Sequence, residues 1–333
     1  MKYAKIKEYE VSRVGIGVAG FGVTFDESES LKILDCYTSA GGNLIDTANV
    51  YMNWDPRARE RASSEKALGR LFKSNPGLRR ELIVCTKGAH YEIADMAYTP
   101  RVNEGCITYD IDDSLRNLGI DRIDLYWLHR DNPTYPVHLI IDALLKAQDE
   151  GKIAYFGASN WSAARIADAN AYARSVGREG FVASQIMYSY VCPLEPDSYA
   201  TRYFDEALDG RTYRDENIAL FSYTSLAKGY MTKMLNGAPL NDRLAKLYDC
   251  PVNRDRAARA AEVAGQIGGG HNAEQVGLAY LHALPYNTVT LVSFNGIWQL
   301  KDSMNCDIDL TPEQLAYLTD DKCGLNRAPQ PER

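Results

Sequence analysis

Features typical of secreted, membrane-spanning and nucleic-acid-binding proteins are absent from this sequence of 333 residues. No stretch reaches the roughly 18 uninterrupted apolar residues of a membrane span, and residues 1–8 lack the apolar run of a signal peptide. With 37 Lys and Arg against 44 Asp and Glu, the net charge of −7 argues against a nucleic-acid binder, which would carry a basic face. We therefore expect a cytoplasmic protein without membrane or nucleic-acid partners, and its oligomeric state stays open.

Paired cysteines are also lacking. The 7 cysteines are scattered along the chain, their number is odd, and none form a Cys-x-x-Cys pair. This distribution suggests neither a disulfide framework nor a zinc site, so no metal is expected. Phenylalanine is scarce, with 8 Phe against 22 Tyr, and tyrosine suits pockets that are apolar on one side and wet on the other.

The sequence does contain a regular alternation of short apolar runs with longer segments of helical periodicity. Glycines such as Gly119 and Gly151 follow the helical segments, where a left-handed C-cap is expected. Eight strand–helix units predict an α/β fold, a single (β/α)8 TIM barrel over residues 1–333 with extended rim loops and C-terminal helices. We interpret residues 193–213 and 235–251 as long loops and the last 20 or so residues as a surface tail. The expected strands are 14–18, 43–46, 81–86, 122–128, 153–158, 181–186, 217–222 and 288–292, and the expected helices are 28–40, 64–72, 102–118, 137–149, 163–175 and 272–283.

The dinucleotide fingerprint Gly-x-Gly-x-x-Gly is matched at Gly15, Gly17 and Gly20. That fingerprint requires a helix to open within the glycines, because the helix N-terminus holds the pyrophosphate. Here the glycines precede Phe-Gly-Val-Thr-Phe, a poor helix, and Asp46 lies 26 residues beyond Gly20 instead of about 20. We favour a glycine-rich turn at the mouth of the first strand over a Rossmann fold.

Polar residues follow the expected strands, and the carboxyl ends of the strands carry the active site of a TIM barrel. Asp46, Lys87 and His129 end the second, third and fourth strands, and Tyr51 follows Asp46 closely. Each alone has a structural explanation, such as a helix cap or a surface charge, but their joint occurrence favours catalysis. Lys87 would lower the pKa of Tyr51 from about 10, and Asp46 would keep Lys87 charged.

The chemistry of this set is that of a general acid which protonates an alkoxide, the species formed when hydride reaches a carbonyl carbon. His129 would orient the substrate oxygen with a hydrogen bond. Three neutral residues at the next strand ends, Ser159, Asn160 and Gln185, suit a carboxamide, and Tyr223 offers a flat face to a nicotinamide ring.

At this point the sequence strongly resembles the aldo-keto reductases. The matching segments occur in the family's order and span most of the chain; they are NLIDTANVY (43–51), IVCTK (83–87), DDSLRNLGIDRIDLYWLH (112–129), GKIAYFGASNW (151–161) and YTSLAKG (223–229). The resemblance implies a (β/α)8 barrel that uses NADP(H) or NAD(H) without a Rossmann domain, and a small-molecule carbonyl or alcohol substrate.

By the same resemblance, Asp46, Tyr51, Lys87 and His129 fall on the catalytic tetrad, with Tyr51 as the general acid. The resemblance also implies nicotinamide contacts and a segment that covers the pyrophosphate. The implied cofactor residues are Gly17, Val18, Ser159, Asn160, Gln185, Tyr223, Thr224, Leu226, Lys228, Ser293, Asn295 and Gln299.

The sequence departs from the family pattern at two places. A longer loop separates Tyr51 from Ser64-Glu65, and we expect it to form a pocket wall in which Trp54, His90 and Tyr91 contact a substrate such as a sugar or polyol. Relatives commonly place a cation for the adenosine 2′-phosphate near the position of Gly296, but here the first is Lys301. Use of either NADPH or NADH is therefore expected.

Two other functions fit the same barrel. A Schiff-base lyase would use Lys87 as its nucleophile, but this requires a neutral amine, which Asp46 opposes. A non-catalytic regulatory subunit is the second alternative, and the complete tetrad argues against it.

Overall fold

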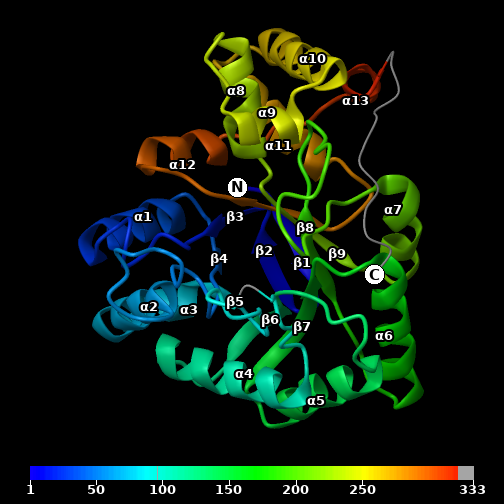
Figure 1. The fold of residues 1–333 in the computed structure, drawn as a ribbon. Helices are drawn as coiled ribbons and strands as arrows, with labels where there is room; N and C mark the ends of the chain where they lie inside the picture. The colour runs from blue at the N-terminus through cyan, green and yellow to red at the C-terminus, as the bar shows by residue number, and fades with distance from the viewer. Residues whose placement is uncertain (96, 322–333) are drawn as a thin grey trace.

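The computed structural model describes residues 1–95 and 97–321 of the chain. Eight parallel strands close into a barrel in the order β10-β3-β4-β5-β6-β7-β8-β9 (Figure 1). The predicted TIM barrel is therefore confirmed, and each of the eight expected strands is present. Their bounds are β3 (Val14–Gly17), β4 (Leu44–Asp46), β5 (Ile83–Gly88), β6 (Ile123–Leu128), β7 (Ile153–Ser159), β8 (Ala183–Met187), β9 (Ala219–Tyr223) and β10 (Thr288–Val292).

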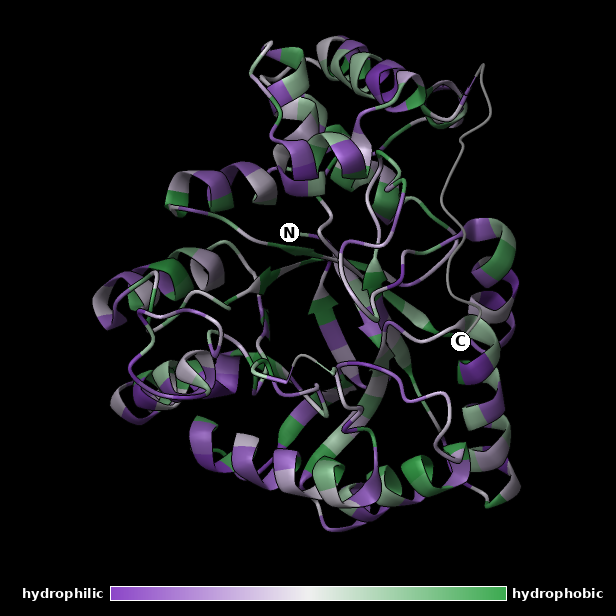
Figure 2. Ribbon diagram, in the orientation of Figure 1, coloured by the Kyte–Doolittle hydropathy of each residue, from purple (hydrophilic) through white to green (hydrophobic). Residues whose placement is uncertain are grey.

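The six expected helices are present as well, with ends that differ from the prediction by no more than about two residues, the usual uncertainty of helix boundaries. Local capping explains several of the ends: Asp26 and Glu29 form a capping box, and Gly119 ends its helix with a φ of 62°. The apolar sides of these helices pack on the barrel (Figure 2). The six are α1 (Glu27–Ser39), α2 (Ser63–Ser74), α4 (Glu104–Leu118), α5 (Val137–Asp149), α6 (Ala163–Ser175) and α11 (Ala273–His282).

The interpretation of residues 193–213 and 235–251 as loops is wrong in part, because helices occupy much of both segments. Together with α11 and α13, the helices α8, α9 and α10 enclose a second cluster of buried residues beside the barrel (Figure 1). Much of the buried side of α10 is alanine, a weak apolar signal in a sequence. The expected C-terminal helices are present as α12 (Ile297–Met304) and α13 (Pro312–Leu318). The elements not foreseen are α3 (Pro76–Glu81), α7 (Glu206–Asp215), the 3-10 turn η1 (Ala227–Gly229), α8 (Tyr230–Leu235), α9 (Asp242–Tyr248) and α10 (Pro251–Ile267).

An N-terminal hairpin, also unforeseen, covers the amino end of the barrel. Its strands β1 (Tyr3–Ile6) and β2 (Tyr9–Ser12) pair antiparallel. Ile6 and Val11 are buried in a cluster that contains residues from the starts of the barrel strands, including Leu44 and Leu125. The hairpin therefore does not cover the carboxyl end of the barrel, where the candidate functional residues lie.

The described part of the chain contains six of the seven cysteines, and all six are free thiols; Cys323 lies outside the described residues. No described helix combines the length and apolar character needed to cross a bilayer. The expected C-terminal tail falls partly on α13, and residues 322–333 lie outside the description.

Candidate active site

The four predicted catalytic residues meet at the carboxyl ends of β4, β5 and β6. Asp46 is the last residue of β4, and Lys87 is near the end of β5. The Lys87 ammonium donates hydrogen bonds to the Asp46 carboxylate, to the Thr47 carbonyl oxygen at 2.8 Å and to the Tyr51 hydroxyl oxygen at 2.9 Å. The Gln185 side-chain amide donates to the second Asp46 oxygen at 2.9 Å. An acid, an ammonium and a phenol therefore form one connected chain.

Lys87 is charged although only 1% of its surface is exposed. Burial alone disfavours an ammonium, but Asp46 and Tyr51 outweigh burial and raise the Lys87 pKa above its usual value. The expectation that Asp46 would keep Lys87 charged agrees with this geometry.

The expected lowering of the Tyr51 pKa is wrong in sign. Burial raises the pKa of Tyr51, and the Lys87 charge opposes that rise without cancelling it. Tyr51 is therefore a neutral phenol at pH 7. Its oxygen accepts from Lys87, so its own proton is available to a second acceptor.

His129 follows β6, and its backbone N–H donates to the Gly88 carbonyl at 2.9 Å. Its ring centroid lies 5.8 Å from that of Tyr51 and 4.6 Å from that of His90. Burial lowers the His129 pKa well below its usual value, and the nearby His90, Arg130 and Lys87 lower it further. A neutral imidazole results, with one ring nitrogen as donor, and the Nδ1 atom is buried without a hydrogen-bond partner.

The predicted carboxamide contacts lie at the same mouth, but protein groups already occupy much of their hydrogen-bonding capacity. The Asn160 amide donates to the Ser159 hydroxyl at 3.0 Å and to the His129 carbonyl at 3.3 Å. Its oxygen accepts from the Tyr223 hydroxyl at 2.7 Å. This network fixes Asn160 and Tyr223 relative to His129. Three of the predicted cofactor residues have a left-handed backbone, a strain that often marks ligand sites: Asn160 (φ 64°), Thr224 (56°) and Lys228 (56°).

A groove of about 1210 Å³ runs beside β9 and β10. The predicted cofactor residues Thr224, Leu226, Lys228, Ser293, Asn295 and Gln299 all line it. Lysines supply positive charge there: Lys228, Lys233 and Lys301. Gly17 lies close by, since a β-carbon on it would sit 3.4 Å from the Ser293 hydroxyl, and the Val18 N–H donates to the Asp46 carbonyl at 3.0 Å.

Aromatic rings form a wall beside Tyr51 and His129. Trp54, half exposed, meets Tyr51 edge-on with ring centroids 6.0 Å apart. The His90 and Tyr91 rings are 4.0 Å apart. Sequence reasoning missed two further members, Tyr98 and Tyr199, which stack at 4.4 Å and also contact Tyr91. The excess of tyrosine over phenylalanine is the only signal that hinted at them.

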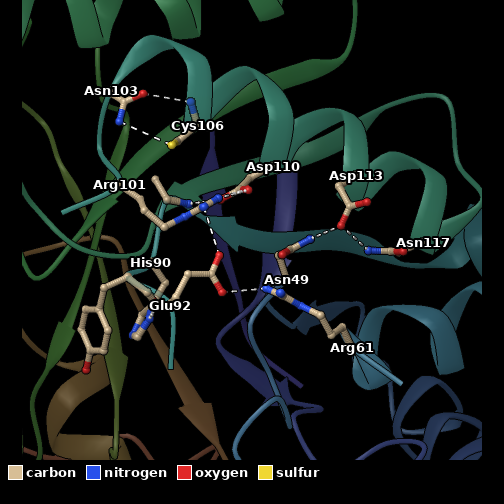
Figure 3. A network of polar contacts seen from close by, with 12 residues as sticks. Asn49, Arg61, His90, Glu92, Arg101, Asn103, Cys106, Asp110, Asp113 and Asn117 are labelled. Carbon is tan, nitrogen blue, oxygen red and sulfur yellow. Dashed lines mark hydrogen bonds and ion pairs between the residues drawn. The ribbon is translucent and has the colours of Figure 1, made fainter. Parts of the chain in front are cut away.

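A second cavity, of about 520 Å³, lies between α2, α4 and the loops that carry this wall. Figure 3 shows Arg101 between two carboxylates, Glu92 at 3.1 Å and Asp110 at 2.6 Å. Arg61 reaches Glu92 from the other loop at 2.8 Å, and Asn49 donates to Asp113 at 2.9 Å. Opposite charges in this cavity are thus paired with each other, and they tie the two wall loops together.

Comparison with known proteins gives one consistent result. The sequence model of the aldo/keto reductase family matches residues 13–321. The uncharacterized oxidoreductase YrpG of Bacillus subtilis is 28% identical over 93% of this chain and 92% of its own length. The aldo-keto reductase str7 of Strobilurus tenacellus is 27% identical over 94% and 89%. An NADP(+) aryl-alcohol dehydrogenase of Phanerodontia chrysosporium is 32% identical over 48% of this chain and 41% of its length.

Proposed function

This chain belongs to the aldo/keto reductase family and is an NAD(P)-dependent oxidoreductase of carbonyl and alcohol compounds, and from that premise we propose that Tyr51 is its general acid and base. One observation carries the proposal. The Lys87 ammonium joins the Asp46 carboxylate to the Tyr51 hydroxyl, so a fixed positive charge lies beside the phenol that must lose its proton.

The residues of the site fit a nicotinamide dinucleotide. The long groove beside β9 and β10 reaches Thr224 and carries lysines suited to phosphates. Ser159, Asn160 and Gln185 would hold the carboxamide, and Tyr223 would lie against the ring. When bound, the cofactor supplies or accepts a hydride.

The chain itself handles the proton and the substrate oxygen. Neutral His129 donates a hydrogen bond to that oxygen and orients it towards Tyr51. Tyr51 then gives its proton to the oxygen during reduction, and the Lys87 charge stabilises the phenolate that is left. Oxidation of an alcohol runs through the same groups in reverse.

For the substrate, we propose a carbonyl compound with a flat or apolar face. Support comes from the wall of Trp54, His90, Tyr91, Tyr98 and Tyr199, because aromatic rings bind such faces well. An aromatic aldehyde and a sugar both fit this description. A Schiff-base reaction at Lys87 is disfavoured, because the amine is charged and has three acceptors.

A cofactor titration tests the proposal. Quenching of protein fluorescence by NADPH and by NADH gives both affinities and so also decides the cofactor preference. Turnover is then followed by loss of NAD(P)H absorbance with panels of aromatic aldehydes and sugars. The proposal predicts binding of at least one cofactor below about millimolar and turnover that depends on a carbonyl substrate. Absence of binding by both cofactors would refute it.

A further inference from the structure

Arg130 directly follows His129 at the carboxyl end of β6, and no motif of the sequence drew attention to it. Its Nη1 donates to the His129 carbonyl oxygen at 2.8 Å, and its own carbonyl accepts from the Trp161 indole N–H at 3.0 Å. The backbone of Arg130 is therefore fixed next to the catalytic imidazole. The side chain is half-buried, and its Nε is buried without a hydrogen-bond partner.

No carboxylate within residues 1–95 and 97–321 lies within ion-pair distance of the Arg130 guanidinium, and other acids nearby are already engaged. The neighbouring Asp131 pairs with Arg165 at 2.8 Å. Asp197, on a loop near Tyr223, pairs with Lys228 and Arg243.

Four other buried or half-buried arginines are treated differently, whereas Arg13, next to His282 and away from the candidate site, resembles Arg130 in that no ion pair of the described residues includes it and its Nε is buried without a partner. Arg101, Arg165, Arg256 and Arg259 each have a carboxylate within about 3 Å. A cation that is partly removed from water without a counter-charge costs free energy. Such a cost is tolerated most readily where a ligand supplies the missing charge.

The Arg130 charge acts on the groups that surround the substrate oxygen. After burial, it is a cause of the lowered pKa of His90, and it also contributes to the lowered pKa of His129. It opposes the rise in pKa that burial imposes on Tyr51 and on Tyr223. The geometry agrees, since the Arg130 Nη1 and the Asn160 amide both donate to the His129 carbonyl oxygen, so the guanidinium lies beside residues of the candidate site.

We propose that Arg130 binds a carboxylate group of the substrate, so that the preferred substrates are aldehydes or ketones that also carry an acid. This inference rests on the proposed function. Nη1 is engaged by the His129 carbonyl, whereas Nε has no partner and Nη2 lies on the same edge of the guanidinium. A planar carboxylate accepts two parallel hydrogen bonds from such an edge. The body of the substrate would then lie along the aromatic wall, with its carbonyl at Tyr51 and His129.

Matched substrates test the proposal on the whole enzyme. 4-Carboxybenzaldehyde and its methyl ester differ in charge but share the aldehyde and the ring. In the wild type the acid should have the higher kcat/KM. In Arg130→Gln, kcat/KM for the acid should fall about 10- to 100-fold, mainly through KM, because a hydrogen-bonded charge pair is lost. The value for the ester should fall by a smaller factor, because the ester loses only the effect of the Arg130 charge on Tyr51 and His129, and Arg130→Lys should retain part of the preference.

Arg57→Gln is the matched control, because Arg57 is an exposed arginine of the wall loop that pairs with Asp55. It should leave the acid-to-ester ratio unchanged. Inhibition of the wild type by benzoate, in comparison with benzamide, gives a second readout that needs no variant. Benzoate should compete with the aldehyde, and added salt should weaken it, whereas benzamide should inhibit poorly.

Three results would overturn the proposal in distinguishable ways. If the wild type reduces acid and ester equally and benzoate inhibits no better than benzamide, Arg130 does not bind a carboxylate, although the proposed function stands. If Arg130→Gln lowers kcat for both substrates equally, the arginine acts only through its electric field on Tyr51 and His129. If neither aldehyde is reduced with either cofactor, the proposed function itself fails.

Discussion

Lys87 and Arg130 are two cations at the ends of neighbouring strands, and the fold treats them in opposite ways. Lys87 is almost completely buried and has three acceptors, one of them the Asp46 carboxylate. Arg130 is half-buried and, within the described residues, has no carboxylate partner at all. The strands that carry them are paired in register, Lys87 opposite Trp127, two residues before His129.

The difference shows how one pocket separates two uses of positive charge. A buried ion pair is fixed in place and its charge acts on its immediate neighbour, here the Tyr51 phenol. A cation without a partner keeps its attraction for an anion from outside. In the roles that we propose, the first arrangement serves proton transfer and the second serves recognition of the substrate.

The largest expected effect on activity follows from removal of the Tyr51 hydroxyl, which accepts a hydrogen bond from Lys87. Tyr51→Phe should lower kcat by about 10²- to 10⁴-fold, because the general acid is lost. Binding of the cofactor should remain within about twofold of the wild type. Steady-state kinetics and the fluorescence titration measure the two quantities. Tyr98→Phe, which removes a hydroxyl from the wall instead, is the control and should keep most of its activity.

Asp46→Asn should convert Lys87 into a cation without a counter-charge. Burial would then lower the Lys87 pKa with only Tyr51 left to oppose it, so the charged form is present below the new pKa and lost above it. We expect activity to fall tenfold or more at pH 8, with a new loss of kcat as the pH rises. Arg130→Gln should show no such alkaline loss, because arginine does not titrate in this range. An unchanged pH profile of kcat in Asp46→Asn would contradict this role of Asp46.

His282 is a buried base outside the candidate site. Unlike Lys87 and Arg130, it carries no charge in the folded protein at neutral pH, because burial lowers its pKa. Burial, assisted by the Arg13 charge, lowers the pKa of His282 to about 4. The folded state keeps His282 neutral, whereas the unfolded state binds a proton below about pH 6.5. His282 therefore lowers the free energy of unfolding as the pH falls from about 6.5 to about 4.

Urea unfolding of the wild type and of His282→Gln measures this contribution. The difference in free energy of unfolding between the two should change by up to about 1.4 kcal/mol per pH unit within that window and be constant above it. The direction is fixed: the wild type loses stability relative to the variant on acidification. A difference that is independent of pH would mean that His282 is protonated in both states or in neither.

The smallest effect concerns the ion pairs that tie the wall loops. Glu92 links Arg61 to Arg101, but nearly half of its side chain is exposed, so the pairs contribute little. Glu92→Gln should raise KM by less than about threefold and leave kcat unchanged. The same effect should appear in the wild type at high salt. A tenfold loss of kcat would show that the loops hold the catalytic residues themselves.

The sequence predicts the barrel well, and also that Asp46, Lys87 and His129 lie near one another, for a physical reason. Buried parallel strands are short apolar runs, and the polar residues that end them must meet at one edge of the sheet. Asp46, Lys87 and His129 could therefore be found without coordinates. The direction of the Tyr51 pKa shift could not, because it depends on how burial compares with the Lys87 charge.

Other features depend on contacts that no local pattern encodes. The hairpin strands β1 and β2 are only four residues long each, and α10 buries alanines. Tyr98 and Tyr199 come from separate loops and meet only in the folded protein. In the sequence, Arg130 stands beside Asp131 and looks paired; the structure shows that Arg165 takes that carboxylate.

Hydride transfer next to Tyr51 is tested most directly with a cofactor that carries deuterium at C4 of the nicotinamide. The wild type should convert an aldehyde into an alcohol with deuterium on the former carbonyl carbon, from one of the two C4 positions, as read by mass spectrometry. Tyr51→Phe should bind the cofactor and transfer almost none. An alcohol free of deuterium with both labels, or transfer undiminished in Tyr51→Phe, would contradict the proposed roles.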